Sequence, residues 1–127
     1  MADLGTPPHF PAIAPIDAYG NGGFRFAGMS HRGSLICLPD GIWGWPVSSP
    51  AELSEQSLAP LLVHAAELDF VLIGSGTDLW PMPEVLRRRF RDLQVSADVM
   101  PTGPAVRTYN VLLAEGRRVA AGLIAVD

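Results

Sequence analysis

Residues 69–81, DFVLIGSGTDLWP, bring an apolar run directly against two closely spaced glycines and a hydroxyl group. In nucleotide-binding proteins a strand leads into a glycine-rich turn, and free N–H groups at the start of the next helix hold the phosphate. The dinucleotide-binding pattern requires a third glycine three residues after the second, where this chain has Leu79. The sequence therefore favours a tight turn in which Gly74 and Gly76 adopt positive φ, and dinucleotide binding is the weaker alternative.

Two other patterns of phosphate binding and nucleophilic catalysis are missing from this segment. No Gly-Lys-Ser/Thr follows the turn, which excludes a P-loop. Ile73 stands where a nucleophile elbow centred on Ser75 would require glycine, so Ser75 is not predicted to be a nucleophile. The sequence therefore contains no catalytic constellation, and it leaves open whether the protein is an enzyme.

The residues that bind metals are scattered along the chain. His9, His31 and His64 share no ligand spacing with one another or with Cys37, so we expect no metal site and no cofactor. A dyad of Cys37 and His64 could form only through folding, and a buried structural cysteine is the favoured interpretation.

Polar residues gather around the start of a predicted helix, residues 102–116. Thr102 and Gly103 open this helix, whose first N–H groups carry partial positive charge. If strand 70–73 ends alongside, the residues that would form a pocket for a small anion or carboxylate are Gly74, Ser75, Gly76, Thr102, Gly103, Arg107, Tyr109 and Asn110. The favoured alternative is a helix capped by Thr102, with Arg107 and Asn110 bracing neighbouring loops.

Two groups of side chains are candidates for contact with another protein. Arg87, Arg88, Arg89 and Arg91 surround the apolar stripe of a predicted helix, and a solvated face is favoured over a protein or anionic-lipid contact. Tryptophans are most often core residues, but an exposed apolar patch that binds protein would include the three of this chain, Trp43, Trp45 and Trp80.

The spacing of apolar residues predicts a short arm followed by one α/β domain. Residues 1–18 carry four prolines and are predicted to be a flexible arm, which leaves residues 19–127 as the domain. Early strands followed by alternating helices and strands imply a mixed sheet with helices packed against it. The predicted strands are 22–29, 34–38, 41–45, 70–73, 94–100 and 119–126, and the predicted helices are 53–68, 83–93 and 102–116.

Composition narrows the functional classes. A chain of 127 residues with 48% hydrophobic residues is one globular domain. Its net charge of -4 argues against nucleic acid as a partner. One cysteine, no apolar run of membrane-spanning length and no signal-peptide pattern predict a soluble cytoplasmic protein without a transmembrane segment.

The glycine turn, the helix 102–116 and the strand after it resemble a widespread family of small domains of unknown function. The pattern I-G-x-G, T-x-x-A-x-x-x-Y-N-x-L and G-x-R-V falls on Ile73, Gly74, Gly76, Thr102, Ala105, Tyr109, Asn110, Leu112, Gly116, Arg118 and Val119. This family includes an adipogenesis-associated protein and a mitochondrial complex I assembly factor. The resemblance implies a three-layer α/β domain with a mixed central sheet and a small N-terminal β element, the Mth-like fold. It implies no established enzymatic activity and no agreed cofactor. One departure is that RDLQV lacks the glycine through which many relatives leave the second helix.

Two functions follow from these observations. The preferred hypothesis is a non-enzymatic assembly or adaptor domain that binds another protein, in connection with the assembly of respiratory or membrane-protein complexes. The alternative is a domain that binds a small anion or metabolite, or an unrecognised enzyme, with its pocket between the Gly-Ser-Gly turn and the helix that starts at Thr102. A homodimer is compatible with either, because a small domain of this class has edge strands.

Overall fold

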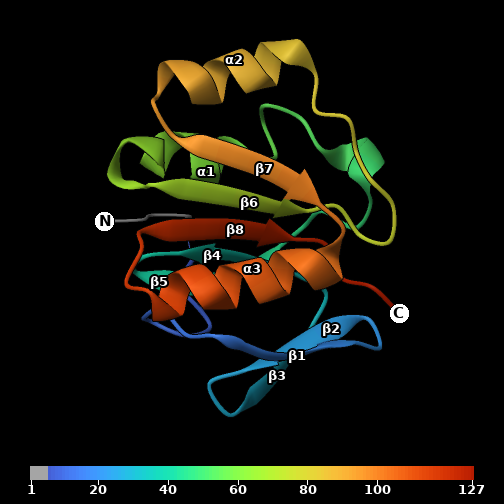
Figure 1. Cartoon of the computed structure of the whole chain (residues 1–127). Coiled ribbons are helices and arrows are strands. Elements are labelled where there is room, and N and C mark those ends of the chain that lie inside the picture. Colours follow the sequence, from blue (N-terminus) through green and yellow to red (C-terminus); the bar gives the residue numbers. More distant parts are fainter. Residues whose placement is uncertain (1–5) are drawn as a thin grey trace.

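The computed structural model describes residues 6–127, which form two sheets and three helices (Figure 1). The larger sheet consists, in spatial order, of β5 (Gly41–Trp45), β4 (Ser34–Leu38), β8 (Val119–Leu123), β6 (Phe70–Gly74) and β7 (Ser96–Met100). The smaller sheet consists of β1 (Ile16–Gly20), β2 (Gly23–Phe26) and β3 (Met29–Arg32). The helices are α1 (Ala59–His64), α2 (Glu84–Asp92) and α3 (Thr102–Ala114), with single 3₁₀ turns at η1 (Pro50–Glu52) and η2 (Ala65–Glu67).

The five-stranded sheet is mixed, as the sequence predicts. β6 pairs in parallel with both β7 and β8, whereas β4 runs antiparallel to β8 and to β5. The parallel half comes from the alternating helices and strands of the C-terminal part, because a parallel pair requires a crossover connection. The antiparallel half is the hairpin of β4 and β5.

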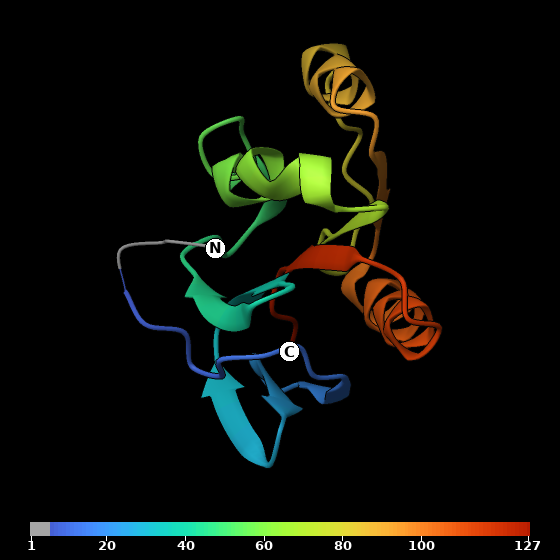
Figure 2. The ribbon, with the colours of Figure 1, turned by 90° about the vertical axis from the view of Figure 1, so that its left-hand side faces the viewer.

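Helices cover both faces of this sheet (Figure 2). The sheet separates the core into two hydrophobic clusters, one on each face. Along β4, Ile36 and Leu38 point to the face covered by α1 and α2, while Leu35 and Cys37 point to the face covered by α3. This alternation follows from the two-residue period of a strand. All five residues of β4 and of β8 are buried, as expected for central strands covered on both sides. The predicted three-layer α/β architecture is therefore confirmed.

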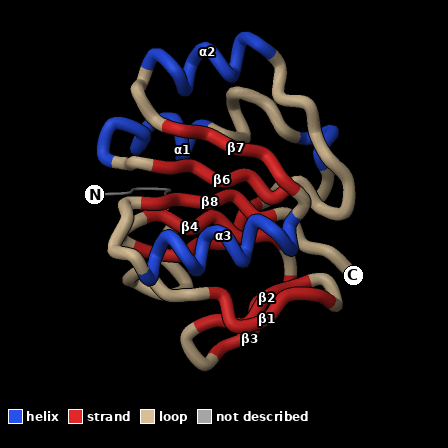
Figure 3. The backbone as a smooth tube through the Cα atoms, viewed as in Figure 1, coloured by secondary structure: helices blue, strands red, loops and turns tan. Residues whose placement is uncertain are grey.

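The small sheet packs on the face that α3 covers (Figure 3). Phe24 and Phe26 of β2 insert into the same core cluster as α3. The predicted strand 22–29 is in fact interrupted, because Ala27 and Gly28 have φ of 50° and 75° and form the tight turn between β2 and β3. Residues 30–32, which lie between the predicted strands 22–29 and 34–38, belong to β3.

The predicted N-terminal arm differs from the structure in its second half. β1 begins at Ile16, inside the range assigned to the arm, and Phe10 forms an isolated bridge with Ile42 of β5. Ala14 is buried in the core, so apolar residues anchor the backbone between the prolines. Residues 1–5 lie outside the described part of the chain.

The predicted helix 53–68 is also broken into shorter pieces. Ser54 and Ser57 bond to each other's backbone in a turn, and α1 starts only at Ala59. Side-chain bonds of serine compete with helix formation, and Pro60 fits only in the first turn of a helix. Residues 50–52 form only the single turn η1, where the Glu52 carboxylate accepts from Ser48 and Ser49 and no side chain caps the N-terminus.

Helices α2 and α3 both end at a residue of left-handed conformation. Gly116 after α3 has a φ of 75°, and Gln94 after α2 has a φ of 58°. The N–H of Val95 bonds back to the carbonyl of Phe90, which completes the usual C-terminal cap. RDLQV therefore forms a left-handed turn at Gln94 although it lacks a glycine.

Candidate functional site

The carboxyl ends of the parallel strands are the region where open α/β sheets bind ligands. Here they are Gly74 of β6, Met100 of β7 and Leu123 of β8. The Gly-Ser-Gly turn leaves β6 at this edge and α3 starts beside it. The fold therefore brings Gly74, Ser75 and Gly76 of the turn next to Thr102 at the start of α3.

Thr102 joins three segments at this edge. Its hydroxyl donates to the carbonyl of Ile124 at 2.6 Å and accepts from the N–H of Gly76 at 3.0 Å. The N–H of Thr102 also donates to the carbonyl of Gly76 at 2.8 Å. Since Pro101 is the N-cap residue, Thr102 is the first residue of α3 and is not its cap. The side chain of Thr102 is fully buried, so its polar atoms connect parts of the fold and do not face solvent.

The space between the Gly-Ser-Gly turn and the start of α3 is filled by their own contact. A Cβ atom added to Gly74 would lie 3.1 Å from the Cα of Thr102 and 3.0 Å from a methyl group of Leu123. A side chain at this position would require its neighbours to move, so glycine suits this close approach. Gly74 and the start of α3 are therefore in direct contact at this point.

Ser75 is buried and its hydroxyl is bonded within the turn. The hydroxyl donates to the carbonyl of Asp78 at 2.5 Å, and the carbonyl of Met100 lies 3.3 Å away. The backbone N–H of Ser75 also donates to Met100. This geometry agrees with the prediction that Ser75 is not a nucleophile.

A surface pocket of about 350 Å³ lies on the other side of the Gly-Ser-Gly turn. Its lining residues come from the η1 region, the turn and the segment after β8, and they are Ser48, Ser49, Pro50, Ser75, Gly76, Thr77, Asp78, Ile124, Ala125, Val126 and Asp127. The lining contains two carboxylates and no arginine. Such a lining favours a neutral or cationic group over an anion.

Tyr19 of β1 covers the first turn of α3. A Cβ atom on Gly103 would lie 2.5 Å from the Tyr19 hydroxyl oxygen. Arg107, which is exposed, donates to the same hydroxyl over a long 3.5 Å. Tyr19 therefore lies against both Gly103 and Arg107, two of the residues predicted to bind an anion.

Asn110 and Tyr109 hold the N-terminal segment against α3. The Asn110 side-chain amide accepts from the N–H of Ile16 and donates to the carbonyl of Ile16, each over 2.8 Å. The Tyr109 hydroxyl donates to the carbonyl of Ala14 at 3.5 Å. Both side chains therefore point away from the Gly-Ser-Gly turn, and bracing is the role that the structure gives Asn110.

Cys37 is buried beside Tyr109, as the sequence predicts for a structural cysteine. Burial raises the pKa of the Cys37 thiol to about 12, and the Tyr109 hydroxyl opposes that shift only in part. Burial also raises the pKa of Tyr109. A thiol held neutral in this way is a poor nucleophile and a poor metal ligand.

The tryptophans have structural positions. Trp43 and Trp45 are buried in the core, and their indole N–H groups donate to the carbonyls of Thr6 and Ser57 at 3.0 Å. The predicted exposed patch therefore does not include them, while Trp80 is half-buried at the edge of the same cluster. The Trp45 ring packs against Gly122 of the distant strand β8.

One pair of histidines was not predicted. The rings of His9 and His31 lie 4.8 Å apart, centre to centre, above Gly44 of β5. Burial, and then the neighbouring His9, lower the pKa of His31. No spacing in the sequence indicates this pair, because His9 and His31 are far apart in the chain and only the fold brings their rings together. Within residues 6–127, no group of three or more metal-binding side chains is found.

No helix in the described part of the chain combines the length and hydrophobicity needed to cross a membrane. A family model for a protein of unknown function (DUF498/DUF598) matches residues 16–124. The chain is 40% identical over 117 residues to an uncharacterized protein of Rhodobacter capsulatus, which covers 92% of this chain and 89% of that protein. It is 28% identical to NADH dehydrogenase (ubiquinone) 1 alpha subcomplex assembly factor 3 of Mus musculus, over 91% of this chain and 62% of that protein. This chain thus spans less than two thirds of the mouse protein.

Solved structures share the fold. The crystal structure of an outer membrane protein from Bartonella henselae superposes with a TM-score of 0.88 at 52% identity, covering 94% of this chain and 100% of that chain. The solution structure of a Mth938-like domain from Bordetella pertussis superposes with a TM-score of 0.77 at 26% identity, covering 97% of this chain and 92% of that chain. The predicted Mth-like fold is therefore confirmed.

Proposed function

The chain belongs to the DUF498/DUF598 family, and from that premise we propose that it is a non-enzymatic assembly or adaptor domain that binds another protein. The family is one of unknown function, so the proposal depends on how this chain uses the residues of the shared pattern. The role of each polar side chain in that pattern decides between a binding site and a structural element.

The observation that supports the proposal is that polar side chains of the pattern bond to other groups of the chain itself. Thr102 bonds to Gly76 and Ile124, and Asn110 bonds to Ile16 on both sides. Arg118 pairs with Asp69 at 3.0 Å beside the start of β6. Groups committed to internal partners are not available to bind a substrate or stabilise a transition state.

A link to respiratory complex assembly is the finer part of the proposal. A relative that aligns with 91% of this chain is an assembly factor for NADH dehydrogenase in the mouse. Proteins with such a role act on other polypeptides, which agrees with a domain whose pattern residues maintain the fold. We propose that this chain acts in the cytoplasm, on partner proteins that are later incorporated into a membrane complex.

Deletion of the gene in the protein's own cells tests this role. We expect the amount of assembled NADH dehydrogenase to fall while its subunits are still made, and wild-type chain supplied in trans to restore it. Purified chain added to the finished complex should leave its NADH oxidation rate unchanged, because an assembly factor acts earlier. Normal levels of assembled complex in the deletion strain would remove the respiratory part of the proposal.

Binding of a small molecule is the second candidate, and its support is the pocket of about 350 Å³ at the carboxyl ends of β6 and β8. Hydroxyl groups of Ser48, Ser49 and Thr77 and the carboxylate of Asp78 suit a neutral or cationic ligand. Thermal unfolding in the presence of polyols, amines and carboxylates shows whether the pocket binds a neutral, a cationic or an anionic ligand. A rise in melting temperature with an amine that Asp78→Asn removes would favour this second function.

A further inference from the structure

We propose that β7 is a docking edge, to which an extended acidic segment of a different protein adds as a further strand. The inference rests on the proposed protein-binding function and names the surface that carries it. It combines three features of the molecule, namely a free strand edge, an adjoining groove and a local reversal of charge.

The outer edge of β7 has backbone groups without partners in the described part of the chain. β7 is the last strand of the five-stranded sheet and pairs only with β6. Ser96 donates to Asp69, and Met100 accepts from Ser75, so Ser96, Asp98 and Met100 face β6. Alternation then directs the N–H and C=O groups of Ala97 and Val99 away from the sheet. Such an edge is a template for another strand.

A groove of about 200 Å³ runs beside this edge, under α2. Its apolar lining consists of Met82, Phe90, Val95 and Ala97, and its cationic lining of Arg87 and Arg91. A strand added to β7 would point alternate side chains toward α2, next to Ala97 and Val99. One apolar side chain of the added strand would enter the groove, and its neighbours on that face would meet the arginines.

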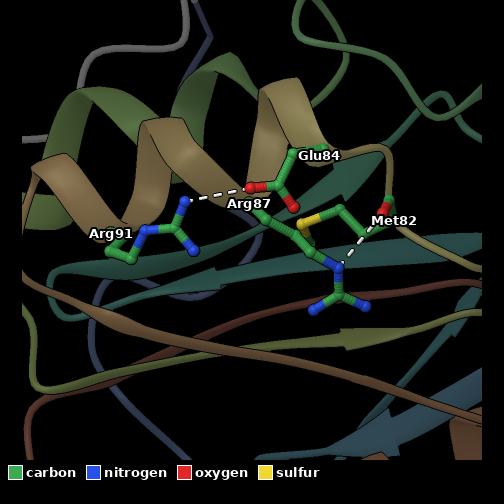
Figure 4. A network of polar contacts seen from close by, with 4 residues as sticks. All are labelled: Met82, Glu84, Arg87 and Arg91. Carbon is green, nitrogen blue, oxygen red and sulfur yellow. Dashed lines mark hydrogen bonds and ion pairs between the residues drawn. The ribbon is translucent and has the colours of Figure 1, made fainter.

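The charge of this surface is opposite to that of the whole chain. The protein has a net charge of -4, yet α2 contains four arginines and two carboxylates. Figure 4 shows Arg87 held through its Nε by the carbonyl of Met82, at 3.1 Å, which leaves its terminal nitrogens directed away from the helix. Arg91 pairs with Glu84 at 3.0 Å on the exposed surface. Carboxylates on the added segment complement this surface.

Self-pairing of β7 is disfavoured by the position of Asp98. An antiparallel pair of two β7 strands would form the most hydrogen bonds when Ala97 pairs with Val99 of the other copy. That register places the exposed Asp98 directly opposite its own copy, on the face away from α2. A register shifted by two residues toward the N-terminus would need the N–H of Val95, which is already bonded to the carbonyl of Phe90. A register shifted by two residues toward the C-terminus would pair Pro101, which has no N–H to donate. The occupant is therefore a different chain.

Proline substitution tests the edge without breaking the internal ladder. In Ala97→Pro only an outward-facing N–H is lost, a position at which sheets tolerate proline. The double variant Arg87→Glu/Arg91→Glu reverses the cationic lining, and Arg107→Glu is a matched control at an exposed arginine outside this surface. The probe is the polypeptide that the wild-type chain retains when it is purified from its own cells, quantified by native mass spectrometry. Slow amide exchange of Asp98 serves as the folding control, and Val99→Pro replaces Ala97→Pro if that control fails.

We expect the proline variant and the double arginine variant to retain the polypeptide at least about tenfold less than wild type, and Arg107→Glu to retain it fully. Equal retention by every variant would overturn the docking edge and leave the proposed function standing. A retained mass equal to this chain's own, lost in Ala97→Pro, would overturn the different-chain occupant. A wild-type chain that retains no polypeptide would remove the proposed function, and the docking edge with it.

Discussion

The side-chain amide of Asn110 in α3 pairs with the backbone of Ile16 in β1 as a neighbouring strand would. The N–H of Ile16 donates to Asn110 Oδ1 and the carbonyl of Ile16 accepts from Asn110 Nδ2, each at 2.8 Å. These two bonds connect residues 94 positions apart. They join the small sheet to the helix that follows β7, and they give Asn110 a structural role in this chain.

Asn110→Ala is expected to lower the free energy of unfolding by about 2 kcal/mol, since two hydrogen bonds are lost and two half-buried backbone groups lose their partner. Urea denaturation measures the change. Val111→Ala, at a neighbouring side chain that is 56% exposed, is the control and should change the stability by less than about 0.5 kcal/mol. Equal effects of the two substitutions would show that the pairing contributes nothing.

Thr102 provides a second test of the structural role of the pattern. Thr102→Val keeps the shape of the side chain but leaves the N–H of Gly76 and the carbonyl of Ile124 unpaired in the interior, at a cost of about 2–4 kcal/mol. Thr102→Ser retains the hydroxyl and should cost only about 1 kcal/mol. Thermal unfolding of the valine and serine variants measures the two losses of stability. A serine variant as unstable as the valine variant would assign the effect to the methyl group instead.

Gln94 is a position where the chain is expected to gain stability. A non-glycine residue in the left-handed region costs about 1–2 kcal/mol, of which the greater backbone entropy of glycine offsets roughly half. Gln94→Gly should therefore raise the free energy of unfolding by about 0.5–1 kcal/mol. Gln94→Ala keeps the Cβ atom and serves as the control, with little change expected. An increase in both variants would mean that the gain has a source other than the backbone conformation.

The pair of His9 and His31 predicts a loss of stability in mild acid. Burial lowers the pKa of His31 below the value of about 6.5 in an unfolded chain, so the unfolded state binds more protons as the pH falls. Stability is then greatest above that unfolded value and declines as the pH falls through the folded pKa. Denaturation at about pH 7.5 and about pH 5.5 should show a smaller decline for His31→Gln than for wild type. Identical declines would exclude His31 as the cause.

The sequence predicted the central elements because their signals are local. Buried strands such as β6 and β8 read as continuous apolar runs, and α3 carries a helical stripe that ends at Gly116. The interruption at Ala27 and Gly28 was missed because alanine is a poor indicator of a left-handed turn. The broken helix around α1 was missed because serine turns compete with an apolar pattern that also fits a helix.

The candidate site was predicted less well, because its contacts join distant parts of the chain. Gly74, Gly76 and Thr102 do meet, and they contact one another directly. Tyr19, which covers Gly103, lies in a strand placed by the small sheet, and no local pattern connects the two. The polar residues at the start of α3 thus indicated correctly that this helix contacts the Gly-Ser-Gly turn. Whether a pocket lies between the two segments depends on the tertiary structure, which no local pattern in the sequence reports.

The most direct test of the account is the mass of the native particle purified gently from the protein's own cells. We expect this chain together with a distinct second polypeptide at a fixed ratio, and no small molecule. A small molecule retained in place of a polypeptide, and lost in Asp78→Asn, would contradict the proposed function and favour the pocket that Asp78 lines.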